Sequence, residues 1–187
     1  MPYTIMLDMD GVVADWTGHT CKLFGQKPED VLKRWNPGDF DIEPALGVTS
    51  EELWNKIDAA GQEWWSSIPE FPWAKDLYEY CNSMADVVFL STPSNDPASL
   101  DGKVEWLQRF TGNNKFRNYI LTPQKHKCAS PDHILVDDSD KNIIKFTLAG
   151  GKGIVFPQTC NSMHWHKDQV GYVMKTLRDT IAGKRDL

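Results

Sequence analysis

The sequence predicts an α/β protein with a Rossmann-like parallel sheet, helices on both faces of the sheet, and a small helical cap inserted after the first strand. Short apolar runs alternate with stretches of helical periodicity, which predicts right-handed crossovers and a parallel sheet covered on both faces. Residues 16–72 break this alternation and contain no convincing strand, which predicts the cap. We therefore assign residues 1–15 and 73–187 to the core and residues 16–72 to the cap.

Five apolar runs, each bounded by polar or turn residues, are expected to form buried strands: Tyr3–Leu7, Val87–Leu90, Tyr119–Leu121, Ile134–Val136 and Gly153–Phe156. Core helices are expected where apolar residues recur at helical spacing. These residues are Trp73, Leu77, Tyr80 and Met84; Leu100, Val104, Leu107 and Phe110; Ile143, Ile144 and Leu148; and Val173, Met174, Leu177 and Ile181. Gly112, Gly150 and Gly183 follow the last three patterns, as is typical of helix ends.

Local signals predict helices and a turn within the cap. Pro28 is typical of a first helical turn, and Asn36–Asp41 is rich in turn-forming residues. Thr49–Glu52 (TSEE) has the pattern of a capping box and opens a helix through Leu53 and Ile57. The cap is therefore predicted to be helical.

Tryptophans are concentrated in the cap, which holds five of the eight in the chain: Trp16, Trp35, Trp54, Trp64 and Trp65. They either form the core of a subdomain too small to bury much else, or provide a stacking platform for a flat ligand. Trp54 lies on the apolar face of its predicted helix and is expected in the core. Trp16 and the adjacent Trp64–Trp65 pair are harder to bury together, which favours the ligand role.

Composition and charge exclude several classes of protein. Of the 187 residues, 41% are hydrophobic and 25% charged, which is typical of a folded domain and excludes a disordered chain. The apolar runs are too short to cross a bilayer, and the N-terminal stretch lacks the basic region of a signal peptide. A formal net charge of −6 argues against a protein that wraps nucleic acid. We expect a cytoplasmic protein without membrane or stable nucleic-acid binding.

The four cysteines form no CxxC pair and are expected to be reduced thiols. Cys160, His164 and His166 are close enough in sequence to share a soft metal ion. A fourth ligand has no evident source, so an ordinary polar loop is the favoured interpretation.

Two acidic clusters follow predicted strands. Asp8 and Asp10 end the first strand ahead of Gly11, and Asp137 and Asp138 end another. Ligands of parallel α/β sheets bind beyond the carboxyl ends of strands, so these carboxylates are expected to meet. On a strand, the side chains of Asp8 and Asp10 would both face this end of the sheet. If the chain instead turns after Asp8, Asp10 offers its backbone carbonyl to a cation. Such hard oxygen ligands suit Mg²⁺ rather than Zn²⁺.

Groups that suit a phosphate follow two further strands. Ser91 and Thr92 place hydroxyls and backbone N–H groups past one strand, and Lys125 places an ammonium past another. Each has an ordinary alternative: a turn or helix N-cap for the hydroxyls, and a solvated surface charge for the lysine. Four strands that end in Asp-x-Asp, Ser-Thr, Lys and Asp-Asp are nevertheless poorly explained by chance.

This order of motifs resembles the haloacid dehalogenase-like superfamily and, within it, the 5′(3′)-deoxyribonucleotidase family. The motifs that carry the resemblance are Asp8–Asp15 (DMDGVVAD), Ser91–Pro93 (STP), Lys103–Gly112 (KVEWLQRFTG), Ile120–Lys125 (ILTPQK) and Ile134–Asp138 (ILVDD). Trp64 and Trp65 stand where the family has a pair of phenylalanines. The stretch between Lys125 and Asp137 is longer than in the family, which makes Lys127 a rival for the family lysine. The preceding Ile-Leu-Thr favours Lys125.

The resemblance implies a Mg²⁺-dependent phosphomonoesterase that hydrolyses (deoxy)ribonucleoside monophosphates to nucleoside and phosphate through an aspartyl-phosphate. It makes Asp8 the nucleophile and Asp10 the general acid and base. It assigns Mg²⁺ to the Asp8 carboxylate, the Asp10 carbonyl and the Asp138 carboxylate, with Asp137 supporting these ligands by hydrogen bonding.

The resemblance further assigns the phosphoryl oxygens to Ser91, Thr92 and Lys125, and the nucleoside to Trp16 and Trp65. It implies a small-molecule nucleotide as the partner and allows a homodimer. Other functions stay open: a phosphatase for another small phosphate ester or for a nucleic-acid 3′-phosphate end, and a non-catalytic phosphate-binding domain.

Overall fold

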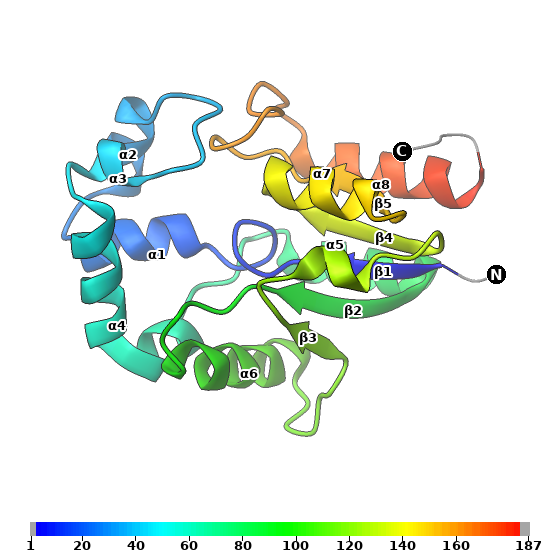
Figure 1. Cartoon of the computed structure of the whole chain (residues 1–187), viewed down its shortest axis with the longest axis horizontal. Coiled ribbons are helices and arrows are strands. Elements are labelled where there is room, and N and C mark those ends of the chain that lie inside the picture. The colour runs from blue at the N-terminus through cyan, green and yellow to red at the C-terminus, as the bar shows by residue number, and fades with distance from the viewer. Residues whose placement is uncertain (1–2, 184–187) are drawn as a thin grey trace.

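The computed structural model describes residues 3–183, which fold around a five-stranded parallel sheet (Figure 1). The sheet has the spatial order β3-β2-β1-β4-β5 and consists of β1 (Thr4–Leu7), β2 (Asp86–Ser91), β3 (Tyr119–Leu121), β4 (His133–Asp137) and β5 (Lys152–Val155). In the central strand, Leu7 pairs with Phe89 on one side and with Val136 on the other. The predicted parallel sheet is confirmed, and each predicted strand ends within one residue of the observed one.

Helices cover both faces of the sheet, because successive side chains of a strand point to opposite faces. On one face Ile5, Leu7 and Phe89 belong to a core that includes α5 (Ala74–Met84), α6 (Ala98–Thr111) and α8 (Gln169–Ile181). On the other face Met6 and Leu135 pack with α7 (Asp140–Leu148). The predicted double cover is therefore confirmed.

The segment between β1 and α5 contains α1 (Trp16–Leu23), α2 (Pro28–Arg34), α3 (Glu43–Leu46) and α4 (Ser50–Ser66). Pro28 is in the first turn of α2, and Thr49 and Glu52 make both hydrogen bonds of the predicted capping box. These helices lie beyond the carboxyl ends of the strands, at one end of the sheet (Figure 1).

The helices of this segment are anchored on the core through α4 and α6. Gly61 adopts φ 65° and ψ −159°, which bends α4 so that its last turns lie against α6 (Figure 1). At Gly102 the helices approach so closely that a Cβ would lie 2.4 Å from the Trp65 Cβ. Just beyond α4, the Ile68 carbonyl accepts a 2.7 Å hydrogen bond from Trp106 Nε1.

Within the described residues, no helix combines the length and the apolar character needed to cross a bilayer. All four cysteines are free thiols.

Candidate active site

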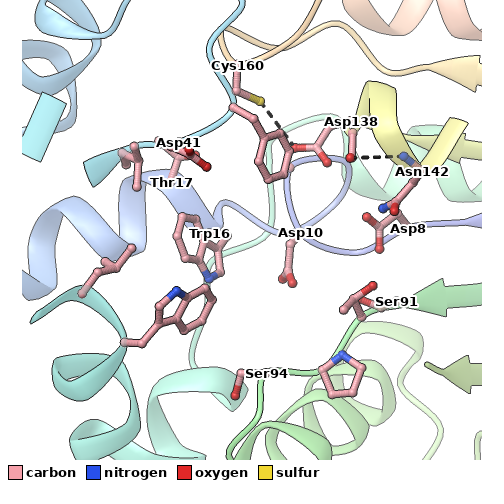
Figure 2. A pocket seen from close by; sticks show the side chains of 18 of the residues that line it. Asp8, Asp10, Trp16, Thr17, Asp41, Ser91, Ser94, Asp138, Asn142 and Cys160 are labelled. Atoms are coloured by element: carbon pink, nitrogen blue, oxygen red, sulfur yellow. Dashed lines mark hydrogen bonds between the residues drawn. The ribbon is translucent and has the colours of Figure 1, made fainter. Parts of the chain in front are cut away.

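The carboxyl ends of β1, β2 and β4 and the residues that follow β3 meet at a cavity of about 560 Å³ between the sheet and the helices that follow β1. Asp8, Asp10, Ser91, Lys125 and Asp138 all line this cavity, as Figure 2 shows for all except Lys125. The predicted convergence of the four strand ends is therefore observed in the structure.

Asp8 is held at the floor of the cavity by the strand and by a buried lysine. Its N–H donates to the Val136 carbonyl at 3.0 Å, which continues the pairing of β1 with β4. Its Oδ1 accepts a hydrogen bond from Met9 N at 2.8 Å and lies 2.8 Å from Lys125 Nζ. These contacts leave Oδ2 without a hydrogen bond from the described residues.

Lys125 bridges two acidic strand ends. Its side chain is 2% exposed, and its ammonium lies 2.8 Å from Asp8 Oδ1 and 2.6 Å from Asp137 Oδ2. Burial alone would lower the pKa of Lys125, but Asp137 and Asp8 outweigh burial and raise the pKa above its usual range. Lys127 is exposed, so the structure places Lys125, not Lys127, in the cavity.

A tight turn brings Asp10 beside Asp8. The Met9 carbonyl accepts hydrogen bonds from the N–H groups of Val13 and Ala14, and Gly11 adopts a φ of 74°. A Cβ at Gly11 would lie 1.9 Å from Asp138 Oδ2, so only glycine fits here. The strand has ended at Leu7, so this turn, and not strand alternation, directs the Asp10 side chain to the cavity (Figure 2).

Asp10 pairs with a lysine that we did not assign from the sequence. Lys103 Nζ donates to Asp10 Oδ2 and, at 3.2 Å, to Ser91 Oγ. Asp10 Oδ1 is buried and has no hydrogen-bond partner among the described residues. Burial raises the pKa of Asp10; Lys103 opposes this rise, and Asp8 adds to it. The raised pKa favours the proton-carrying form that a general acid requires.

The sequence carried a signal for Lys103. Ser99, Trp106 and Leu107 lie at helical spacing from it and are all buried, so Lys103 belongs to the buried face of α6. A lysine on a buried helix face needs a charged partner, and the acidic strand ends are the evident candidates.

The carboxylates of Asp8, Asp137 and Asp138 have oxygens within 4.8 Å of one another. Asp137 is already occupied: its Oδ1 accepts from Ser139 N at 2.9 Å and from Asn142 Nδ2 at 3.1 Å, and its Oδ2 faces Lys125. Among the described residues, Asp138 Oδ2 has only a weak 3.9 Å contact, from the Cys160 thiol (Figure 2). Asp138 is therefore the freer of the two carboxylates.

The charges of the site fit a divalent cation. Asp8, Asp10, Asp137 and Asp138 outnumber the ammonium groups of the two buried lysines. Burial and then the like charges of Asp137 and Asp8 raise the pKa of Asp138 well above its usual range. A cation held by oxygen ligands would offset this repulsion, and a hard ion such as Mg²⁺ matches a donor set made only of oxygens.

The predicted hydroxyls lie in different surroundings. Ser91 is buried and receives the Lys103 hydrogen bond, whereas Thr92 is exposed, and its Oγ1 donates to the Thr122 carbonyl at 3.4 Å. Both residues line the cavity.

The side of the cavity formed by the helices that follow β1 is aromatic. Trp16 lines it (Figure 2). The ring centroid of Trp16 lies 6.3 Å from that of Trp54. The expectation that Trp54 is a core residue is wrong: it is 38% exposed and faces the cavity, because the apolar face of α4 extends past the core into this opening. Trp64 and Trp65 are buried together, which corrects the expectation that such a pair resists joint burial. Trp65 still contributes to the lining.

The loop with Cys160, His164 and His166 does not bring these residues together as a metal site. Cys160 turns to Asp138, and His164 Nδ1 lies 2.9 Å from the Asn161 carbonyl. The Asn161 side chain donates to the Asp138 carbonyl at 2.8 Å, so this loop braces the acidic end of β4.

Comparisons with solved structures agree with this fold. A hydrolase from Streptococcus pneumoniae TIGR4 matches with a TM-score of 0.54 and 14% identity, over 88% of this chain and 98% of that one. A HAD family hydrolase from Deinococcus radiodurans R1, with bound phosphate and sodium, matches with a TM-score of 0.54 and 12% identity, over 98% and 96%. CbbY from Rhodobacter sphaeroides, in complex with xylulose-(1,5)bisphosphate, matches with a TM-score of 0.51 and 14% identity, over 87% and 89%.

The fold is thus one that the chain shares with these hydrolases. The family model described as 5′ nucleotidase, deoxy (pyrimidine), cytosolic type C protein (NT5C) matches residues 2–173, and the chain belongs to this family. A comparison with curated protein sequences gives no match. The protein is accordingly a phosphatase of the 5′-nucleotidase type.

Proposed function

We propose that the protein hydrolyses (deoxy)ribonucleoside monophosphates to nucleoside and phosphate, with Mg²⁺ as cofactor and a phosphate ester on Asp8 as intermediate. The observation that carries this proposal is the placement of two carboxyl groups side by side. Asp8 is fixed through one oxygen by Lys125, and Asp10, with its raised pKa, presents a buried unpartnered oxygen.

In the first step Asp8 Oδ2 attacks phosphorus while the bond to the ester oxygen breaks. Asp10 gives its proton to that oxygen, so the nucleoside leaves as a neutral alcohol. In the second step the Asp10 carboxylate takes a proton from water as the water oxygen attacks phosphorus. The bond to Asp8 then breaks, and phosphate and a free carboxylate result.

Lys125, Ser91 and Thr92 are proposed to hold the phosphoryl oxygens. Lys125 keeps its proton throughout because its pKa is raised, so it supplies a fixed positive charge to the transition state. Asp8, the Asp10 carbonyl and Asp138 would hold Mg²⁺, and Asp137 would orient Asp8 through Lys125. When bound, the cation supplies charge neutralisation between the anionic nucleophile and the anionic phosphate.

The cap side of the cavity supports a nucleoside as the leaving group. We propose that residues 16–72 act as a cap and that Trp16 and Trp65 contact the nucleoside, with Trp54 beside Trp16. Asp41, Glu43 and Asp58 also line this side, and Lys125 is the only lysine or arginine among the described residues that line the cavity. A substrate with one phosphate and an uncharged end matches this distribution better than a bisphosphate or a polynucleotide end.

A panel of deoxy- and ribonucleoside 5′- and 3′-monophosphates tests the proposal, with phosphate release measured in the presence of Mg²⁺. We expect turnover of several members and at least tenfold lower kcat/KM for glycerol phosphate, which lacks a base to stack. If kcat/KM for glycerol phosphate equals or exceeds that for every nucleotide, the nucleotide assignment is contradicted. Asp8→Asn is the control for contaminating phosphatases.

A further inference from the structure

Lys103 is a buried charge with no role in the steps proposed above. Its side chain is 1% exposed, and it does not line the cavity, unlike Lys125. Burial of an ammonium is costly unless the charge is paired, and the partner here is Asp10. Lys103 therefore lies behind the proposed general acid, not beside the phosphate.

The ammonium is enclosed by groups from three parts of the fold. Asp10 comes from the turn after β1, Ser91 from the end of β2 at 3.2 Å, and Trp65 from α4, with its ring centroid 5.0 Å from Lys103 Nζ. A cation above an indole face is attracted by the ring, so Trp65 adds a contact that depends on the position of α4.

The helices that carry Lys103 and Trp65 cannot slide freely. At Gly102 a Cβ would lie 2.4 Å from the Trp65 Cβ and 2.7 Å from the Gln62 carbonyl oxygen, so α6 and α4 are in backbone contact next to Lys103. The position of Lys103 Nζ is therefore tied to the segment that covers the cavity.

We propose that Lys103 is a positioning residue that fixes the Asp10 carboxyl group for proton transfer to the leaving group and links this geometry to Trp65 of the cap. The proposal rests on the proposed phosphatase mechanism. Lys103 holds Oδ2, and the unpartnered Oδ1 of Asp10 is the atom left to meet the leaving oxygen. The proton that moves belongs to Asp10.

The test compares leaving groups in Lys103→Met, which keeps the aliphatic stem and removes the ammonium. A nucleoside leaves as a strongly basic alkoxide and needs a proton, whereas para-nitrophenolate is stable without one. Because kcat/KM reports steps up to the first bond cleavage, we expect it to fall about 100-fold for a nucleoside monophosphate and less than about fivefold for para-nitrophenyl phosphate. KM for the nucleotide should change by less than threefold or so, since Lys103 does not line the cavity.

Lys75→Met is the matched control, because Lys75 also lies over an aromatic ring, at 3.9 Å from the Phe110 centroid, but outside the site. Lys75→Met should leave kcat/KM unchanged for both substrates. Lys103→Gln, which keeps a donor, gives a second measurement should Lys103→Met fold poorly, and the same dependence on the leaving group is expected. Equal losses on both substrates, or no loss on either, in a folded variant would overturn the proposal.

The wild-type protein separates this proposal from the function on which it rests. Wild-type activity on para-nitrophenyl phosphate but on no nucleotide would overturn only the nucleotide assignment, and glycerol phosphate would then serve as the ester with a basic leaving group. No activity on any phosphate ester would overturn the proposed function itself.

Discussion

Lys125 Nζ lies 2.8 Å from Asp8 Oδ1 and fixes one oxygen of the proposed nucleophile. The same ammonium lies 2.6 Å from Asp137, so a single buried charge ties the ends of β1 and β4 together. The site depends on this link because Asp8 and Asp137 would otherwise repel each other across adjacent strands.

Lys125→Met should lower kcat by about 100- to 1000-fold, because it removes a fixed positive charge from the transition state. It should also lower the melting temperature, since two buried carboxylates lose their partner. Steady-state kinetics and thermal unfolding measure the two effects. Lys127→Met, at an exposed position, is the control and should change kcat less than twofold or so. A larger loss of kcat in Lys127→Met than in Lys125→Met would make Lys127 the lysine that stabilises the transition state.

Asp138→Asn should weaken Mg²⁺ activation at least tenfold more than Asp137→Asn does, because the Asp137 oxygens are occupied by Ser139 N, Asn142 and Lys125. Activity titrated against Mg²⁺ gives the apparent affinity of each variant. If Asp137→Asn loses more Mg²⁺ affinity than Asp138→Asn, Asp137 and not Asp138 is the metal ligand.

Mg²⁺ should also stabilise the fold more at neutral than at acidic pH. The pKa of Asp138 is raised by burial and by Asp137 and Asp8, so the folded metal-free protein binds more protons than the unfolded chain above pH ~4. Its stability therefore falls as the pH rises from this value through the raised pKa. Melting temperatures with Mg²⁺ and with a chelator should differ more at pH 7 than at pH 5. A difference that does not grow with pH would contradict the charge argument.

Trp16→Ala should raise KM for nucleotides by an amount that corresponds to about 1–3 kcal/mol of lost stacking, and Trp54→Ala should act in the same direction. Hydrolysis of acetyl phosphate, which is too small to reach the cap, should barely change. Trp65 is 2% exposed, so Trp65→Ala should also lower the melting temperature, with a loss of roughly 3–5 kcal/mol in unfolding free energy. Equal loss of acetyl phosphate and nucleotide activity in Trp16→Ala would make Trp16 purely structural.

The acidic cap side should discriminate against a second phosphate. We expect a nucleoside 3′,5′-bisphosphate to have at least about tenfold lower kcat/KM than the 5′-monophosphate, because Asp41 and Asp58 repel it. Asp41→Asn combined with Asp58→Asn should narrow this gap, and low salt should widen it in the wild-type protein. If the ratio of kcat/KM between the monophosphate and the bisphosphate changes neither in the double variant nor at low salt, selection by charge is contradicted.

Much of the fold could be predicted because strand and helix signals in the core are local. The apolar runs at Val87–Leu90 and Ile134–Val136 are bounded by polar residues, and parallel pairing follows from their alternation with helices. The acidic strand ends could be located for the same reason: residues that end parallel strands meet at one edge of the sheet.

The remaining features depend on how elements pack, which local patterns do not record. The helical pattern places Trp54 on an apolar face, but not whether that face meets core or cavity. Lys103 is 93 residues from Asp10, and their contact exists only because α6 packs beside the turn after β1. Cys160 reaches Asp138 through a loop whose course no periodicity predicts.

Detection of a phosphoryl group on Asp8 tests the central claim most directly. Asp10→Asn should let the phosphoenzyme form from para-nitrophenyl phosphate, whose leaving group needs no proton, and should slow its hydrolysis, because no base activates water. After an acid quench, mass spectrometry of the peptide that contains Asp8 should show one added phosphoryl group, which is absent in Asp8→Asn. The account would be contradicted if the wild-type protein turns over substrate but Asp10→Asn carries no adduct on this peptide. An adduct on another residue would contradict it as well.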